Sequence, residues 1–251
     1  IDDAAASLSH NGFCVLRLPT PIIPTTECSN LATSCVSRLN ILFDLARKRG
    51  IEPKRDIMRF TEVCCRTPGG LRYDMRFASE GHQYHSGSSG DGILPPLPSS
   101  WDELYSGVEA IVRPILTKQG NDTVSVDSAG CVTSLPRAPD QHFHPDGTAE
   151  GLINCFVPLV PVDQENGPTE LRPGSHVWVD SPYGRVPRWD ERTQLPVCPN
   201  LLQPAQDLLL FDYRVYHRGQ ANRSAQPRPV GYLAFACREG LSDTHNFPRE
   251  A

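Results

Sequence analysis

The chain has 251 residues, of which 39% are hydrophobic, and its formal net charge is −5. This length and apolar content suit a single domain over residues 1–251 rather than two small ones. No apolar run approaches the roughly eighteen residues of a transmembrane helix, so we expect no membrane span. The basic residues form no tract or stripe, which argues against nucleic-acid binding.

Nine cysteines are spread along the chain without a CxxC pair or a zinc-type spacing. Several lie in apolar runs, such as Cys155 in "LINCFVPLV", and we interpret them as reduced and buried. This pattern predicts a reducing compartment and therefore an intracellular, cytoplasmic protein. The first residues lack the basic and apolar regions of a signal peptide, although a targeting segment upstream of Ile1 stays open.

The first predicted elements are a short strand and a long helix. "GFCVLRL" at 12–18 is typical of a strand. The segment 24–50 has apolar residues at helical spacing, Thr25 or Thr26 as N-cap, and a glycine at its end. Both elements would precede the main sheet.

A second helix is predicted from about residue 100 to 112, with Ser100 as N-cap and Glu103 completing a capping box. The Gly/Ser-rich stretch 80–92 before it is expected to be a flexible insert. We therefore expect residues 1–120 to form a helical, lid-bearing N-terminal part.

From about residue 123 the pattern changes to short apolar runs separated by Pro, Gly and Asn. The runs are "TVSVD", "GCVTSL", "GLINCFVPLVPV", "TELRPGSH", "DLLLFDYRVYH" and "VGYLAFACR". Regular short strands between turns favour a β-sandwich or barrel, so residues 121–240 are predicted to be an antiparallel β core. The stretch 180–206 is predicted to be a long loop across one mouth of it.

Candidate metal ligands stand out in "QHFHPDG" at 141–147. In an extended segment, residues i and i+2 point to the same side, so His144 and Asp146 project together. The same parity places His217 at the end of the inward-facing row of "FDYRVYH". Two histidines and one carboxylate suit non-haem Fe(II) and leave coordination positions open. Zinc would accept the same ligands.

Arg228 distinguishes between these chemistries. It lies eleven residues after His217 (228 − 217 = 11), at the start of the next predicted strand. An arginine one strand away from the last ligand could hold the far carboxylate of a metal-chelating diacid, namely 2-oxoglutarate. A cupin-type metal-dependent hydrolase or isomerase would use the same three ligands but would give Arg228 no role. A non-catalytic binding module is the third alternative, and the complete ligand set counts against it.

The ordered motifs "QHFHPDG", "NGPTELRPGSH" and "LLLFDYRVYHRGQANRSAQPR" resemble the phytanoyl-CoA dioxygenase family of Fe(II)/2-oxoglutarate oxygenases. The resemblance spans residues 129–237 and implies a double-stranded β-helix, or jelly roll, preceded by N-terminal helices. It implies the iron ligands His144, Asp146 and His217. It also implies four 2-oxoglutarate contacts, namely Arg228, Ser224, Gln141 and Thr169.

The resemblance also implies the cofactors Fe(II), 2-oxoglutarate and O₂, with ascorbate as a stimulant, and the products succinate and CO₂. Halogenating relatives have Gly or Ala in place of Asp146, so its presence favours hydroxylation or a related oxidation. The substrate would be a small molecule, and an anionic one would suit the arginines, which make up 24 − 3 = 21 of the 24 basic residues.

Substrate contacts are predicted in "LRYDMRF" at 71–77, where Arg72, Asp74 and Arg76 share one side, and at Trp189 in the long loop. An exposed strand face that carries ion pairs is the alternative for the first three residues.

Overall fold

The computed structural model describes residues 1–56, 58–60, 62–67, 69–78, 94–177, 179–181, 184–186 and 195–243. The helices are α1 (Asp2–Asn11), α2 (Thr25–Lys48) and α3 (Ser100–Lys118), with a short 3₁₀ helix at Ser175–Val177. The strands are β1 (Phe13–Arg17), β2 (Val63–Cys65), β3 (Arg72–Ala78), β4 (Ser125–Ser134), β5 (Leu152–Pro158), β6 (Thr169–Leu171), β7 (Val179–Ser181), β8 (Gly184–Val186), β9 (Asp207–Asp212), β10 (His217–Gly219) and β11 (Arg228–Ala236). None of the described helices combines the length and hydropathy that a bilayer crossing requires.

The strands form a jelly roll. Seven of them make one antiparallel sheet in the order β1-β9-β5-β11-β4-β3-β2, while β10 pairs with β6 and β7 pairs with β8. Isolated bridges at Leu171↔Val197 and His144↔His217 extend the smaller face around β6 and β10. This arrangement confirms the predicted mainly-β fold with N-terminal helices.

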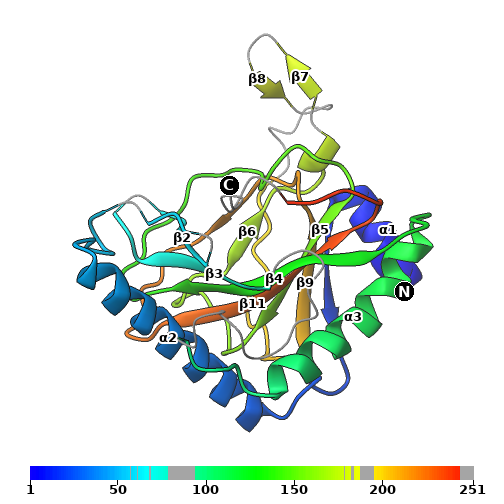
Figure 1. Cartoon of the computed structure of the whole chain (residues 1–251). Helices are drawn as coiled ribbons and strands as arrows, with labels where there is room; N and C mark the ends of the chain where they lie inside the picture. The colour runs from blue at the N-terminus through cyan, green and yellow to red at the C-terminus, as the bar shows by residue number, and fades with distance from the viewer. Residues whose placement is uncertain are drawn as a thin grey trace.

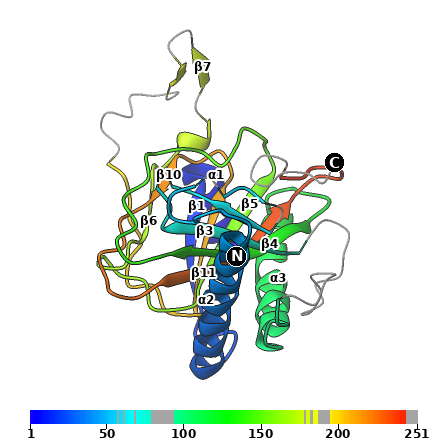
Figure 2. The same cartoon turned by 60° about the vertical axis from the view of Figure 1, so that its left-hand side comes forward.

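Helices α2 and α3 lie together on one side of the large sheet (Figures 1 and 2). Their apolar residues, including Leu31, Leu39 and Leu104, form one core with sheet residues such as Leu233 and Phe235. Because the helices cover the outer face, the inner face of the sheet is available to line a cavity.

Both long helices begin differently from the prediction. Pro24 is the N-cap of α2, and it makes no side-chain cap hydrogen bond. Helix α3 has Ser99 as N-cap, and the Ser100 hydroxyl is buried without a hydrogen-bond partner, so the predicted capping box is wrong. The helix is fixed here by burial of Ser100 and Trp101 rather than by a local cap.

Helix α3 also runs past its predicted end to Lys118, with Pro114 inside it. Proline removes one backbone hydrogen bond, but Ile115 and Leu116 are buried beyond it and hold the last turn against the core. Helix α1 has no counterpart among the predicted elements.

The predicted strand "DLLLFDYRVYH" is broken. Strand β9 ends at Asp212, the Val215 amide turns back to the Asp212 carbonyl, and β10 begins at His217. The stretch 180–206, predicted to be a loop, contributes to the short β7–β8 pair. The insert 80–92 lies outside the described residues.

Strand β3 is buried on both faces. Tyr73 and Met75 belong to the core shared with the helices. Arg72 and Asp74, on the other face, line the inner cavity and are 1% and 4% exposed. The alternative interpretation, an exposed strand face, is therefore wrong for these two residues, because the polar face of β3 lines the inside of the jelly roll.

Candidate metal centre

His144 and His217 meet through their backbones. Each amide donates to the other residue's carbonyl at 3.0 Å, which forms an isolated antiparallel bridge. The two imidazole rings lie 4.8 Å apart between centroids. A loop residue and a strand residue that are 73 positions apart (217 − 144 = 73) are thus fixed side by side by main-chain bonds.

The ring nitrogens of the two histidines have distinct roles. His144 Nδ1 lies 2.8 Å from the His142 carbonyl, and His217 Nδ1 lies 2.9 Å from the Val215 carbonyl. A carbonyl oxygen only accepts, so each Nδ1 carries the hydrogen and donates. In the neutral rings both Nε2 atoms therefore keep a lone pair, which is the arrangement that orients metal-binding histidines.

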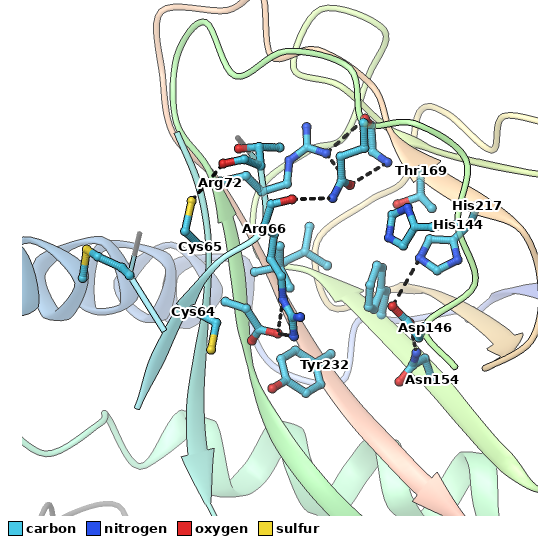
Figure 3. Close-up of a pocket in the computed structure, with 18 of the residues that line it drawn as sticks. Cys64, Cys65, Arg66, Arg72, His144, Asp146, Asn154, Thr169, His217 and Tyr232 are labelled. Atoms are coloured by element: carbon cyan, nitrogen blue, oxygen red, sulfur yellow. Dashed lines mark hydrogen bonds and ion pairs between the residues drawn. The ribbon is translucent and has the colours of Figure 1, made fainter. Parts of the chain in front are cut away.

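Asp146 completes the group. Its Oδ1 lies 3.7 Å from His217 Nε2, and its Oδ2 accepts a 2.6 Å hydrogen bond from Asn154 Nδ2 on β5. One ligand atom from each of His144, Asp146 and His217 lies within 4.8 Å of the others. We call these three residues the triad; Figure 3 shows them on one side of the cavity. Because Asn154 occupies Oδ2, Oδ1 of Asp146 is the oxygen that would be left to bind a metal ion.

The triad lines a cavity of about 640 Å³ on the inner face of the large sheet. Burial, and then the neighbouring His217 ring, lowers the pKa of His144. The imidazole is therefore neutral at pH 7, as metal binding requires. The donor set fits Fe(II), because two imidazoles and one carboxylate leave open coordination positions.

Arg228 lines the same cavity from the start of β11 and is 4% exposed. Its Nε is buried without a hydrogen-bond partner, and no carboxylate pairs with its guanidinium within the described residues. Burial, and then repulsion from Arg72, lowers its pKa to about 9. A buried cation without an anion is costly, so its place in a cavity points to an anionic ligand.

Arg72 differs from Arg228 in its hydrogen bonds. Its Nη1 donates to Gln141 Oε1 at 2.6 Å and to the Gly219 carbonyl at 3.0 Å, and its Nη2 donates to the Gln220 carbonyl at 2.8 Å. Gln141 is itself tied to the Arg66 carbonyl through Nε2. Arg72 thus joins β3 to the two chain segments that carry the triad, although the sequence suggested a substrate contact.

Of the other residues predicted to contact 2-oxoglutarate or substrate, some line the cavity and some do not. Thr169 lies in the cavity wall and is buried. Ser224 is placed outside this cavity, where its hydroxyl donates to Asn222 Oδ1 at 2.7 Å. Arg76 is half-buried on β3 and is absent from the described lining. Trp189 lies outside the described residues.

Two features of the site were missed in the sequence. Asn154, which orients Asp146, is a polar residue within the apolar strand β5, and that contrast could have marked it. Arg66 and Asp74 form an ion pair at 2.5 Å in the cavity wall. No pattern in the sequence joins Arg66, which precedes a turn, to Asp74 in the next strand.

Part of the chain is similar to a known family and to known dioxygenases. The family model described as Phytanoyl-CoA dioxygenase (PhyH) matches residues 123–230. Dioxygenase aneA of Aspergillus aculeatus is 33% identical over 129 residues, which cover 45% of this chain and 40% of that protein. Multifunctional dioxygenase ausE of Penicillium brasilianum is 27% identical over 131 residues, which cover 47% of this chain and 42% of that protein. The matches thus span about two fifths of the length of these relatives.

A solved structure shares the fold. The alpha ketoglutarate dependent epimerase SnoN from nogalamycin biosynthesis aligns with a TM-score of 0.61 and 16% sequence identity, and the alignment covers 94% of this chain and 80% of that chain. The family match contains all three triad residues and Arg228. Over residues 123–230 this chain is therefore similar to the phytanoyl-CoA dioxygenase family, and it shares its fold with a solved structure.

Proposed function

We propose that this chain is an Fe(II)- and 2-oxoglutarate-dependent oxygenase that acts on a small molecule. The triad would hold Fe(II), and Arg228 would bind the distal carboxylate of 2-oxoglutarate. The observation that carries the proposal is the buried, unpaired guanidinium of Arg228 in the cavity that the triad lines. A cupin-type hydrolase or isomerase would leave that charge without a function.

The chain's own residues prepare the site for this chemistry. The Nδ1 hydrogen bonds of His144 and His217 turn both Nε2 atoms toward the metal position. Asn154 keeps Oδ1 of Asp146 facing the same position. Thr169 lies in the wall nearby and would offer its hydroxyl to the cosubstrate. Bound iron and 2-oxoglutarate would supply the oxidising chemistry, which converts 2-oxoglutarate and O₂ into succinate, CO₂ and an oxidised substrate.

Hydroxylation of a C–H bond is the outcome that we favour. Asp146 occupies the position through which a halide would reach the metal in halogenating relatives. Strands β1, β2 and β3, from the first 120 residues, complete the large sheet, which supports one catalytic domain over residues 1–251.

The test uses purified protein loaded with Mn(II), which binds the same ligands without turnover, and measures 2-oxoglutarate binding by calorimetry. The Fe(II)-loaded protein is then assayed for succinate release under O₂. We expect His217→Ala to abolish metal binding and succinate release, because one of three ligands is lost, while His10→Ala on the exposed face of α1 retains both. Wild-type protein that takes up metal but does not bind 2-oxoglutarate would contradict the proposal.

A further inference from the structure

The cavity has a polar wall that contains neither the triad nor Arg228. In Figure 3, Arg66 and Tyr232 lie across the cavity from the triad. Asp74 lies next to Arg66 and binds its guanidinium. This wall is where the prime substrate would contact the protein.

Arg66 is fixed at both ends. Its Nε and Nη2 donate to the same oxygen, Oδ2 of Asp74, at 3.1 and 2.5 Å. Its backbone amide donates to the Arg72 carbonyl at 2.8 Å, and its carbonyl accepts from Gln141 Nε2 at 3.0 Å. The Arg66 side chain is 24% exposed and that of Asp74 is 6% exposed, so the carboxylate lies deeper and the guanidinium stands between it and the cavity.

The guanidinium keeps its charge in this position. Burial opposes the charge of Arg66, but Asp74, and then Asp146 and Tyr232, outweigh it and hold the pKa above its usual range. Arg66 and Asp146 line the same cavity, and Figure 3 shows them on facing sides of it. A group bound by Arg66 would therefore lie on the side of the guanidinium that faces the triad.

The cavity has a positive balance although the chain is acidic. Its described lining contains five arginines and four aspartates and no lysine or glutamate, which gives 5 − 4 = +1 with the histidines neutral. A divalent metal and the 2-oxoglutarate dianion cancel each other. The described lining of the loaded cavity thus keeps a positive balance, which suits an anionic substrate.

We propose that Arg66, positioned by Asp74, binds an anionic oxygen group of the prime substrate, a carboxylate or a phosphate, and so presents the neighbouring C–H bonds to the metal. The inference rests on the proposed function and specifies its substrate class. Guanidinium groups form strong, charge-assisted hydrogen bonds with carboxylate and phosphate oxygens. A buried ion pair costs desolvation, so a wall that only enclosed an apolar substrate would be made more simply from apolar residues.

The test compares compounds that share a carbon skeleton and differ in one group: a carboxylate, a phosphate monoester or a primary amide. Binding of each to protein loaded with Mn(II) and 2-oxoglutarate is measured by calorimetry. We expect at least one anionic form to bind about tenfold more tightly than the amide, a difference of about 1.4 kcal/mol. The carboxylate and phosphate arms identify which anion is preferred.

The decisive variant is the double substitution Arg66→Gln and Asp74→Asn, which removes both charges and leaves no buried carboxylate unpaired. We expect its anion-to-amide ratio to fall to about one, while its unchanged 2-oxoglutarate affinity shows that the cavity has folded. Arg238→Gln, on an exposed side chain, is the matched control and should keep the wild-type ratio.

Three results would overturn the substrate class: amides that bind as tightly as anions, an anion preference that survives in the double variant, or no binding of any compound in the series. If the wild-type protein does not bind 2-oxoglutarate in the absence of these compounds, that result would instead contradict the proposed function.

Discussion

Arg72 and Arg228 have similar positions and different environments. They lie on β3 and β11, the two neighbours of β4, and both are in register with Ser134. They are 1% and 4% exposed. The Arg72 side chain donates to the carbonyls of Gly219 and Gln220, whereas the Arg228 side chain has no hydrogen bond with a described residue.

Burial lowers the pKa of both groups, to about 10 for Arg72 and about 9 for Arg228. Burial and charge therefore do not separate the two arginines. What separates them is whether the protein itself supplies acceptors. An arginine whose acceptors are backbone carbonyls stabilises the fold, and one without acceptors is prepared for a ligand.

The largest effect is expected for Arg72→Met. The substitution leaves the Gly219 and Gln220 carbonyls and the Gln141 side chain without their donor, so the free energy of unfolding should fall by about 4 kcal/mol. Chemical denaturation of the metal-free protein measures this. A decrease in unfolding free energy of less than about 1 kcal/mol would show that Arg72 does not stabilise the fold.

Arg228→Met should have the opposite effect on stability. The variant removes a buried charge that no described residue pairs, so the metal-free protein should unfold at the same or a higher denaturant concentration. Its affinity for 2-oxoglutarate should fall about 100-fold, because a charge-assisted pair to the distal carboxylate is lost. Calorimetry on Mn(II)-loaded protein tests the affinity. If Arg228→Met and Arg72→Met lose stability alike, the contrast between the two arginines does not hold.

A third arginine environment lies outside the cavity. The ring of Phe143, between His142 and His144, has Arg172 Cζ 4.4 Å and Arg218 Cζ 4.7 Å from its centroid. These cation–π contacts hold the loop that carries His144. Phe143→Leu should weaken metal binding about tenfold, and Phe143→Tyr, which keeps an aromatic ring, should retain it. Titration with Co(II), followed by its absorption spectrum, measures the affinity. Equal metal affinities of the Phe143→Leu and Phe143→Tyr variants would show that the aromatic ring does not help to position His144.

The smallest effect concerns His176, a buried group that can become cationic. Its Nε2 lies 3.2 Å from the Ser9 carbonyl, and its Nδ1 is buried without a partner. Burial lowers its pKa, with Asp212 opposing. At pH values between the lowered pKa of folded His176 and its usual pKa of about 6.5, the imidazole is protonated more in the unfolded chain than in the folded one. The folded protein therefore loses stability as the pH falls below about 6.5.

We expect His176→Gln to reduce the stability loss between about pH 7.5 and 5.5 by about 1 kcal/mol relative to the wild type. Denaturation series at the two pH values, both with chelator, measure it. Parallel pH dependence of the two proteins would show that another group is responsible.

The sequence by itself determined the local part of this protein. Alternation in an extended segment was enough to place His144 and Asp146 together, and short runs between turns were enough for a β core. These predictions hold because the period of a strand is a property of neighbouring residues. His217 was also placed inward, although through a strand that the structure breaks after Asp212.

Only the tertiary structure decided what the polar residues contact. The acceptors of Arg72 lie between 62 and 148 positions further along the chain, and Asn154 reaches Asp146 from another strand. Ser224, close to Arg228 in the sequence, is turned outside the cavity. Long-range pairing of strands sets these distances, and a hydrogen bond depends on tenths of an ångström that spacing along a chain does not encode.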